Sequence, residues 1–186
     1  MLKLASVLLI ALAVVYSSAA LAQSASGRKS EAVKFSSLYT DLNRDCRNAF
    51  KSVGEGQDMP LNCKGYGGYK IYIWYSAMAA QLAVNSLDGK YTNFLAMQKL
   101  DYSDEKGRKI EWRLADGKPF AVILRISKYK DENAGALEYF SAQNKAGEFL
   151  IVKGLKGHEK IDFEVNVKDG NPNEKARKLA DSNYAK

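Results

Sequence analysis

Hydrophobic and polar residues alternate along much of this chain, which is the pattern of β-strands that bury one face. The alternation is cleanest over residues 109–127, which we predict to form a hairpin. Its first strand turns Trp112 toward the core and leaves Glu111 and Arg113 toward solvent. An Asp-Gly dipeptide, which favours tight turns, then leads into a second strand over residues 120–127.

The same alternation predicts about seven strands in all. Besides the hairpin, candidate strands lie at residues 33–39, 69–76, 81–86, 136–142, 148–153 and 160–168, with a turn at 145–147. The last strand places Ile161, Phe163, Val165 and Val167 on its inner face. Short strands separated by Gly- or Asp-rich turns favour antiparallel pairing. We therefore predict a mostly β, α+β fold, an antiparallel sandwich or half-barrel.

Two helices are predicted to interrupt the strands. A short N-terminal helix is expected over residues 41–53, where apolar residues recur at helical spacing. A C-terminal helix is expected after Asn171, which can cap it, with Pro172 in its first turn. Its narrow apolar stripe predicts that it packs along a surface; the stripe consists of Ala176, Leu179, Ala180 and Tyr184.

The first 22 residues match an export signal. Lys3 precedes an apolar run over residues 4–15, and Ala20-Leu21-Ala22 offers the small-x-small pattern that signal peptidase cuts. A retained membrane anchor is the alternative, but the run is shorter than the ~20 residues that span a bilayer. No Cys lies near the expected cut, so a lipoprotein is not expected. We predict a periplasmic or secreted protein with no transmembrane segment after cleavage.

The remaining chain is expected to form a flexible leader over residues 23–32 and a single β-rich domain over residues 33–186. The formal net charge is +7, and loss of Lys3 with the signal would leave +6. This charge favours anionic surfaces such as phospholipid head groups or acidic envelope polymers. Nucleic acid is not an expected partner, because the protein is exported and has no block of five Lys or Arg residues.

Cys46 and Cys63 are the only cysteines. In an exported protein this pair predicts a disulfide. A catalytic redox pair is the alternative, but such pairs typically have Cys-x-x-Cys spacing, which this chain lacks.

Catalytic and metal-binding signals are sparse. His158 is the only histidine, so a two-histidine metal site is not possible, and we expect it in an exposed turn. The acidic residues near position 101 lack the spacing of a calcium loop and are interpreted as a solvated turn; they are Asp101, Asp104 and Glu105. No cofactor and no metal are predicted.

A glycine-rich segment and an aromatic patch adjoin the second cysteine. Residues 64–69 are interpreted as a tight turn, and a backbone site close to a ligand is the alternative. Beyond the turn, Tyr72 and Trp74 share one strand face with Lys70. This face either lies in the core under the C-terminal helix or is exposed, where it could stack on sugars or contact a partner protein.

Several segments together resemble a family of small exported bacterial proteins whose function is uncharacterised. The segments are Tyr-Thr-Asp-Leu at 39–42, Cys46, Cys-Lys-Gly-Tyr-Gly-Gly-Tyr at 63–69, and the stretches 110–113, 117–125 and 173–181. Members of that family often carry further cysteines near the C-terminus, and this chain has none there. The resemblance implies no catalytic or binding residue.

These observations predict an exported, non-enzymatic domain that binds an anionic envelope component or a partner protein. The candidate ligand-binding residues are Lys64, Tyr66, Lys70, Tyr72 and Trp74. The alternative is a glycan hydrolase that uses two carboxylates. Its candidate carboxylates are Glu111, Glu138, Asp162 and Glu164. Two carboxyl groups converging in a concave pocket would favour the enzyme.

Overall fold

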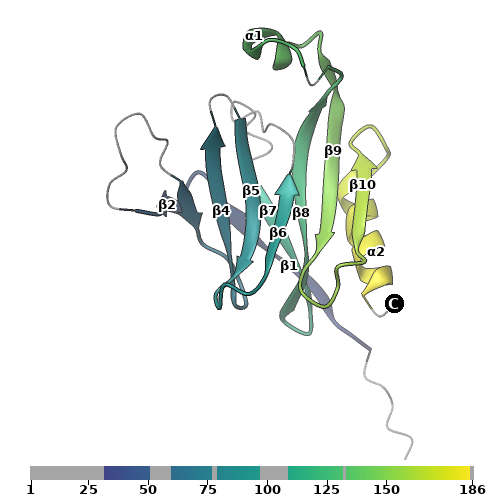
Figure 1. Ribbon diagram of the computed structural model, residues 1–186. Helices are drawn as coiled ribbons and strands as arrows, with labels where there is room; N and C mark the ends of the chain where they lie inside the picture. The colour runs from purple at the N-terminus through teal and green to yellow at the C-terminus, as the bar shows by residue number, and fades with distance from the viewer. Residues whose placement is uncertain (1–31, 51–59, 77–78, 97–108, 132, 185–186) are drawn as a thin grey trace, which may run out of the picture. The chain divides into compact units, whose positions relative to one another are not determined.

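Two antiparallel sheets pack face to face as a β-sandwich in the computed structural model (Figure 1). The structure describes residues 32–50, 60–76, 79–96, 109–131 and 133–184. The first sheet has the order β1-β7-β8-β9-β10, with bounds Phe35–Asp41, Lys109–Ala115, Lys118–Tyr129, Lys145–Gly154 and Asp162–Asn166. The second has the order β2-β3-β4-β5-β6, with bounds Cys46–Asn48, Leu61–Cys63, Tyr69–Ser76, Ala79–Ser86 and Thr92–Ala96. The described residues thus hold ten strands rather than about seven.

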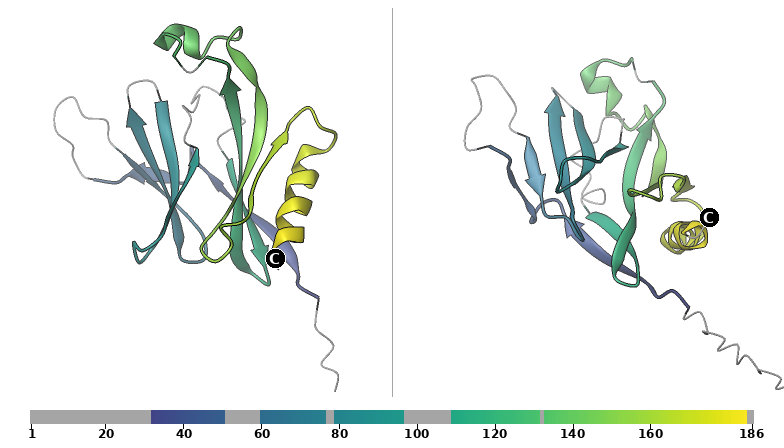
Figure 2. Two further views of the ribbon diagram at one scale, coloured as in Figure 1. Left: turned by 45° about the vertical axis from the view of Figure 1, so that its right-hand side comes forward. Right: turned by 60° about the horizontal axis from the view of Figure 1, so that its bottom comes forward.

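The core has two layers, because the first sheet is covered on both faces. Between the sheets lie large, fully buried side chains that include Ile71, Ile73, Leu82, Trp112 and Leu124. On the other face of the first sheet, helix α2 (Pro172–Asn183) buries Ala176 and Ala180 against a second cluster that includes Ile123 and Val165. Figure 2 shows α2 beside β10, on the side of the first sheet away from the second.

The predicted hairpin and the C-terminal helix are both confirmed. β7 and β8 pair antiparallel, and Trp112 is 1% exposed between the sheets. The Trp112 Nε1–H donates to Thr40 Oγ1 at 2.9 Å, which ties β7 to the edge strand β1. Helix α2 begins at Pro172 as expected, although the Asn171 side chain forms no capping hydrogen bond.

The predicted helix over residues 41–53 is wrong. Strand β1 ends at Asp41, a turn follows, and β2 begins at Cys46. Carboxylates in the turn accept backbone N–H groups: Asp45 Oδ2 from Asp41 at 2.9 Å, and Asp41 Oδ1 from Asn43 at 3.0 Å. Such local bonds compete with helix formation. Residues 51–59 lie outside the described part of the chain.

The expected strand over residues 136–142 and the turn over 145–147 are also wrong. The first segment contains the single-turn helix α1 (Ala136–Tyr139), and β9 already starts at Lys145. Gly147 pairs with Lys128, and a register shift between Lys128 and Tyr129 leaves Ala146 as the extra residue of the β8–β9 ladder. A strand need not end near a glycine when a bulge absorbs the extra residue beside it.

Glu111 and Arg113 are buried, contrary to the prediction that they face solvent. They are 7% and 5% exposed, because α2 covers their face of the sheet. The Arg113 guanidinium donates to both carboxylate oxygens of Asp181, at 2.6 and 2.7 Å from Nη2. Arg177 donates to Glu111 at 2.6 and 3.1 Å. Two ion pairs therefore hold α2 on β7, and Ser37 links them by bonding both Glu111 and Arg113.

Arg113→Ala should lower the free energy of unfolding by about 2–3 kcal/mol. Loss of one partner from a fully buried ion pair costs about 3–5 kcal/mol, and the partial exposure of Asp181, 23% of its side chain, reduces this effect. Urea denaturation followed by circular dichroism measures the change. Glu174→Ala, which breaks an exposed pair on the same helix, should have no measurable effect. Equal effects would contradict the assigned role of the Arg113 ion pair.

Candidate functional site

The outer face of the second sheet is the candidate site. On β4 and β5 the inward positions are apolar and buried, while Lys70, Tyr72 and Trp74 point outward. The register places Arg47, Asn62, Tyr72, Ala83 and Phe94 in one row across all five strands. The suggestion that the C-terminal helix covers this face is wrong, because α2 packs on the other sheet.

Along β4, the outward side chains form an ordered ladder. The Lys70 ammonium lies 4.8 Å from the centroid of the Tyr72 ring, and Tyr72 stacks on Trp74 with centroids 5.3 Å apart and planes 19° apart. Ala83, the register partner of Tyr72 on β5, is fully buried. Because Lys70 and Trp74 flank Tyr72, Trp74 is the ring with a face available to a ligand; it is 36% exposed.

A shallow basic groove of about 710 Å³ adjoins the Lys70 end of this ladder. Its lining carries four cationic side chains and one carboxylate: Arg44, Arg47, Lys64, Lys70 and Asp45. Within the described residues, Arg47, Lys64 and Lys70 form no ion pair. The groove therefore holds positive charge that the described part of the protein leaves unneutralised.

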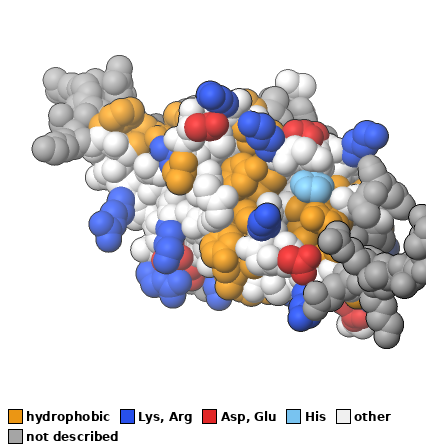
Figure 3. Space-filling view, turned by 90° about the horizontal axis from the view of Figure 1, so that it is seen from below, with side chains coloured by type: hydrophobic (Ala, Val, Ile, Leu, Met, Phe, Trp, Pro, Cys, Tyr) orange, Lys and Arg blue, Asp and Glu red, His pale blue; other side chains and the backbone are white. Residues whose placement is uncertain are grey.

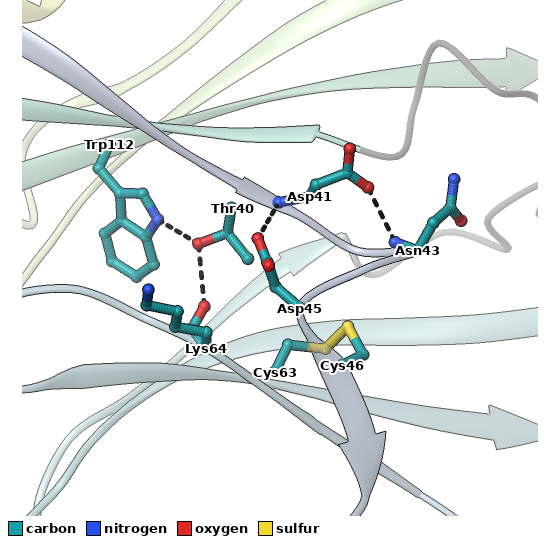
Figure 4. Close-up of a disulfide and its surroundings, with 8 residues drawn as sticks. All are labelled: Thr40, Asp41, Asn43, Asp45, Cys46, Cys63, Lys64 and Trp112. Atoms are coloured by element: carbon teal, nitrogen blue, oxygen red, sulfur yellow. Dashed lines mark hydrogen bonds between the residues drawn. A yellow bond between two sulfur atoms is a disulfide. The ribbon is translucent and has the colours of Figure 1, made fainter.

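The Cys46–Cys63 disulfide, shown in Figure 4, links β2 to β3, and both strands contribute residues to the basic groove. The two cysteines are directly opposite each other in β2 and β3, so Arg47 lies beside Asn62 and close to Lys64. The Lys64 N–H donates to the Asp45 carbonyl at 2.8 Å, and the Lys64 carbonyl accepts from Thr40 Oγ1 at 2.9 Å. The backbone that carries Lys64 is therefore fixed to both β1 and the turn before β2.

The glycine turn after Lys64 is confirmed, and its first glycine, Gly65, lines the groove. Gly67 and Gly68 have φ values of 57° and 90°, which side-chain-bearing residues rarely adopt. A Cβ on Gly65 would lie 1.9 Å from the Tyr69 carbonyl oxygen, so the loop closes only with glycine there.

The carboxylate in the groove is held ionised. The hydrogen bond from Arg44 lowers the pKa of Asp45, and the backbone N–H of Asp41 lowers it further. In return, the bond to Asp45 raises the pKa of Arg44. The charges of Arg44 and Asp45 thus cancel near neutral pH. The excess positive charge of the groove comes from Arg47, Lys64 and Lys70.

Asn85 adds unused hydrogen-bonding capacity beside Lys70. It faces Lys70 across the β4–β5 ladder. Its buried Oδ1 has no hydrogen-bond partner among the described residues. A buried polar atom without a partner costs free energy, so this position favours a donor from outside the sheet.

The candidate residues are only partly brought together. Lys64 and Lys70 line the groove, and Tyr72 and Trp74 continue from it. Tyr66 lies in the exposed loop and is not among the lining residues. Arg44 and Arg47 were not anticipated, because their segment was assigned to a helix. Their positions on either side of Cys46, combined with the predicted disulfide, were the signal that could have located them near Lys64.

The four candidate catalytic carboxylates lie elsewhere. Glu111 pairs with Arg177 under α2, Asp162 with Lys153, and Glu164 with Lys128, while Glu138 is exposed on α1. The basic groove and a second cavity, along α2, each contain one carboxylate, Asp45 and Glu174 respectively. Neither cavity thus has the two converging carboxyl groups that a glycan hydrolase needs.

His158 is not a solvated turn residue as expected. Its ring stacks on Tyr184 with centroids 4.9 Å apart, and Phe120 packs edge-on against it. Phe35 completes this aromatic cluster. Figure 3, seen from below, shows the histidine side chain beside hydrophobic side chains on the lower face of the protein, with Lys and Arg side chains spread around them. The candidate calcium residues 101, 104 and 105 lie outside the described part of the chain.

No protein-family model, no curated protein and no solved structure matches this chain. The resemblance to small exported bacterial proteins therefore stays a prediction. Among the described residues, no helix is both long enough and apolar enough to cross a membrane.

Proposed function

We propose that this protein is an exported, non-enzymatic domain that binds an anionic component of the cell envelope in the basic groove. The observation that carries the proposal is the convergence of Arg47, Lys64 and Lys70 in one groove without an ion pair among the described residues. Cationic side chains that lack protein partners attract anions and speed their encounter. A partner protein that binds this groove would need an acidic surface.

The proposed export rests on two independent features. The N-terminal segment 1–22, which lies outside the described residues, has the charge, apolar run and cleavage pattern of a signal peptide. The Cys46–Cys63 disulfide is a bond that persists in oxidising compartments. Both features favour the periplasm or the exterior as the site of action.

The double variant Arg47→Gln with Lys64→Gln should weaken binding of an anionic polymer, polyphosphate, by at least about tenfold at physiological salt. Isothermal titration calorimetry measures the dissociation constant. The matched control is Lys175→Gln with Lys178→Gln, which removes the same charge from exposed positions on α2, on the far side of the first sheet from the groove. It should change affinity by less than about twofold, because exposed charges more than ~8 Å from the ligand are screened at physiological salt.

Asp45→Asn tests the same groove by removing a negative charge, and it should change the affinity in the opposite direction. The amide keeps an oxygen for the Asp41 N–H, while its lost charge leaves Arg44 without a carboxylate partner in the groove. Affinity for polyphosphate should therefore rise, and binding of every variant should weaken as salt increases. Equal losses in the groove variant and its control, or binding that salt does not change, would contradict the proposed site.

A further inference from the structure

We infer that the ligand of this groove is an acidic polysaccharide, whose sugar rings extend from the groove onto the exposed face of Trp74. The inference rests on the proposed function, and it adds the chemistry of the ligand. The first support is continuity: Lys70 belongs to the groove lining and is also the first member of the Lys70–Tyr72–Trp74 ladder. A ligand that pairs with Lys70 is therefore next to the aromatic rings.

The second support is the mixture of side chains on this face. Trp74 offers an aromatic face and is 36% exposed, and Phe94 is 45% exposed on the far strand of the same sheet. Amide side chains flank the ladder on the neighbouring strands: Asn62 is opposite Tyr72, Gln81 is opposite Trp74, and Asn85 is opposite Lys70. Sugar rings carry hydroxyl groups that bond to amides and C–H faces that pack on aromatic rings. A simple inorganic anion would use only the cations.

The third support is the distance between Lys70 and Trp74 along β4. Lys70 and Trp74 are four residues apart on β4, which spans roughly 13 Å at a rise of ~3.3 Å per residue. One monosaccharide or one phosphate ion cannot reach both. A ligand that contacts both Lys70 and Trp74 is therefore a chain, with an anionic group near Lys70 and a sugar-ring face against Trp74. A lipid head group also carries the anion, but its acyl chains would need an apolar groove rather than this polar face.

The experiment compares four probes on the purified protein with its disulfide intact: an oligogalacturonate long enough to span the face, a neutral malto-oligosaccharide of equal length, polyphosphate, and vesicles of anionic phospholipid. The protein has two tryptophans, and Trp112 is 1% exposed in the core. A change in tryptophan fluorescence on binding therefore reports on Trp74. We expect the oligogalacturonate to change it and to bind more tightly than any other probe.

The variant Trp74→Ala separates charge from ring contact. By calorimetry it should weaken oligogalacturonate binding by about tenfold or more, which corresponds to loss of about 1.4 kcal/mol, and leave polyphosphate binding within about twofold. Trp74→Phe keeps an aromatic ring. Its affinity for oligogalacturonate should therefore lie between those of the unaltered protein and Trp74→Ala. Tyr39→Ala removes an exposed aromatic side chain from the other sheet, 54% exposed, and should change neither affinity. A thermal unfolding scan of each variant confirms that it is folded.

The outcomes distinguish this inference from the proposal beneath it. If Trp74→Ala binds oligogalacturonate as well as the unaltered protein does, the ring contact is refuted while the anion-binding groove stands. Tighter binding to anionic vesicles than to oligogalacturonate would refute the polysaccharide and identify a lipid surface as the ligand. If none of the three anionic probes binds, the proposed function itself is wrong.

Discussion

Trp112→Ala is expected to lower the free energy of unfolding by about 3–5 kcal/mol, the range for truncating a large aromatic side chain in a core. Trp112 lies between the two sheets and is 1% exposed. Its ring is 6.5 Å from that of Tyr69 on the opposite sheet, so its loss opens a cavity where the sheets meet. It also removes the donor to Thr40 Oγ1, which connects β1 to β7.

The matched control is Trp74→Ala, the same substitution at the other tryptophan. Because Trp74 is 36% exposed, its removal leaves no enclosed cavity, and the expected loss is about 1 kcal/mol or less. Urea denaturation followed by far-UV circular dichroism measures both proteins without relying on tryptophan emission. Similar losses in the two variants would mean that the interior of the sandwich is not centred on Trp112.

Removal of the disulfide, by Cys46→Ala with Cys63→Ala, should cost about 3 kcal/mol. The bond closes a loop with a sequence separation of 17, and the expected cost is the conformational entropy that this loop regains in the unfolded chain. Alanine is preferred to serine because Cys63 is 2% exposed and a hydroxyl there would be buried. The strand β2 is only three residues long, and the cross-link adds a covalent bond to its short antiparallel pairing with β3.

Urea midpoints of the oxidised protein, the reduced protein and the double-alanine variant test this expectation. The reduced protein and the variant should agree with each other and lie well below the oxidised protein. An oxidised midpoint equal to the reduced one would show that β2 and β3 hold together without the bond.

Period-two alternation located the strands correctly where it was regular, as in β7 and β8, because a residue pair two apart must share a face. It misjudged Glu111 and Arg113 for a physical reason. Alternation separates the two faces of a strand, but it does not reveal whether another element covers the polar face. Here α2 brings Arg177 and Asp181 from far along the chain to pair with them, a contact that no local pattern encodes.

The error over residues 41–53 has a similar origin. Apolar spacing favours a helix, yet residues 41–45 form a turn and the pairing of Cys46 with Cys63 places residues 46–48 in an edge strand. Because of that error, the sequence analysis did not place Arg44 and Arg47 in the basic groove. Lys64 and Lys70 were identified from their own surroundings, whereas Arg44 and Arg47 join them only through the disulfide and the β2–β3 register. The predicted disulfide, applied as a distance constraint, would have predicted this proximity.

Anionic ligands are proposed to bind in the groove lined by β2, β3 and the start of β4. The most direct test is a titration of isotope-labelled protein with oligogalacturonate, followed by amide chemical shifts in two-dimensional NMR spectra. We expect the largest shifts on Arg47, Asn62, Lys64 and Lys70, and we expect them to diminish as salt increases. Shifts concentrated instead on α2 and the first sheet, or no shifts at all, would contradict this proposal.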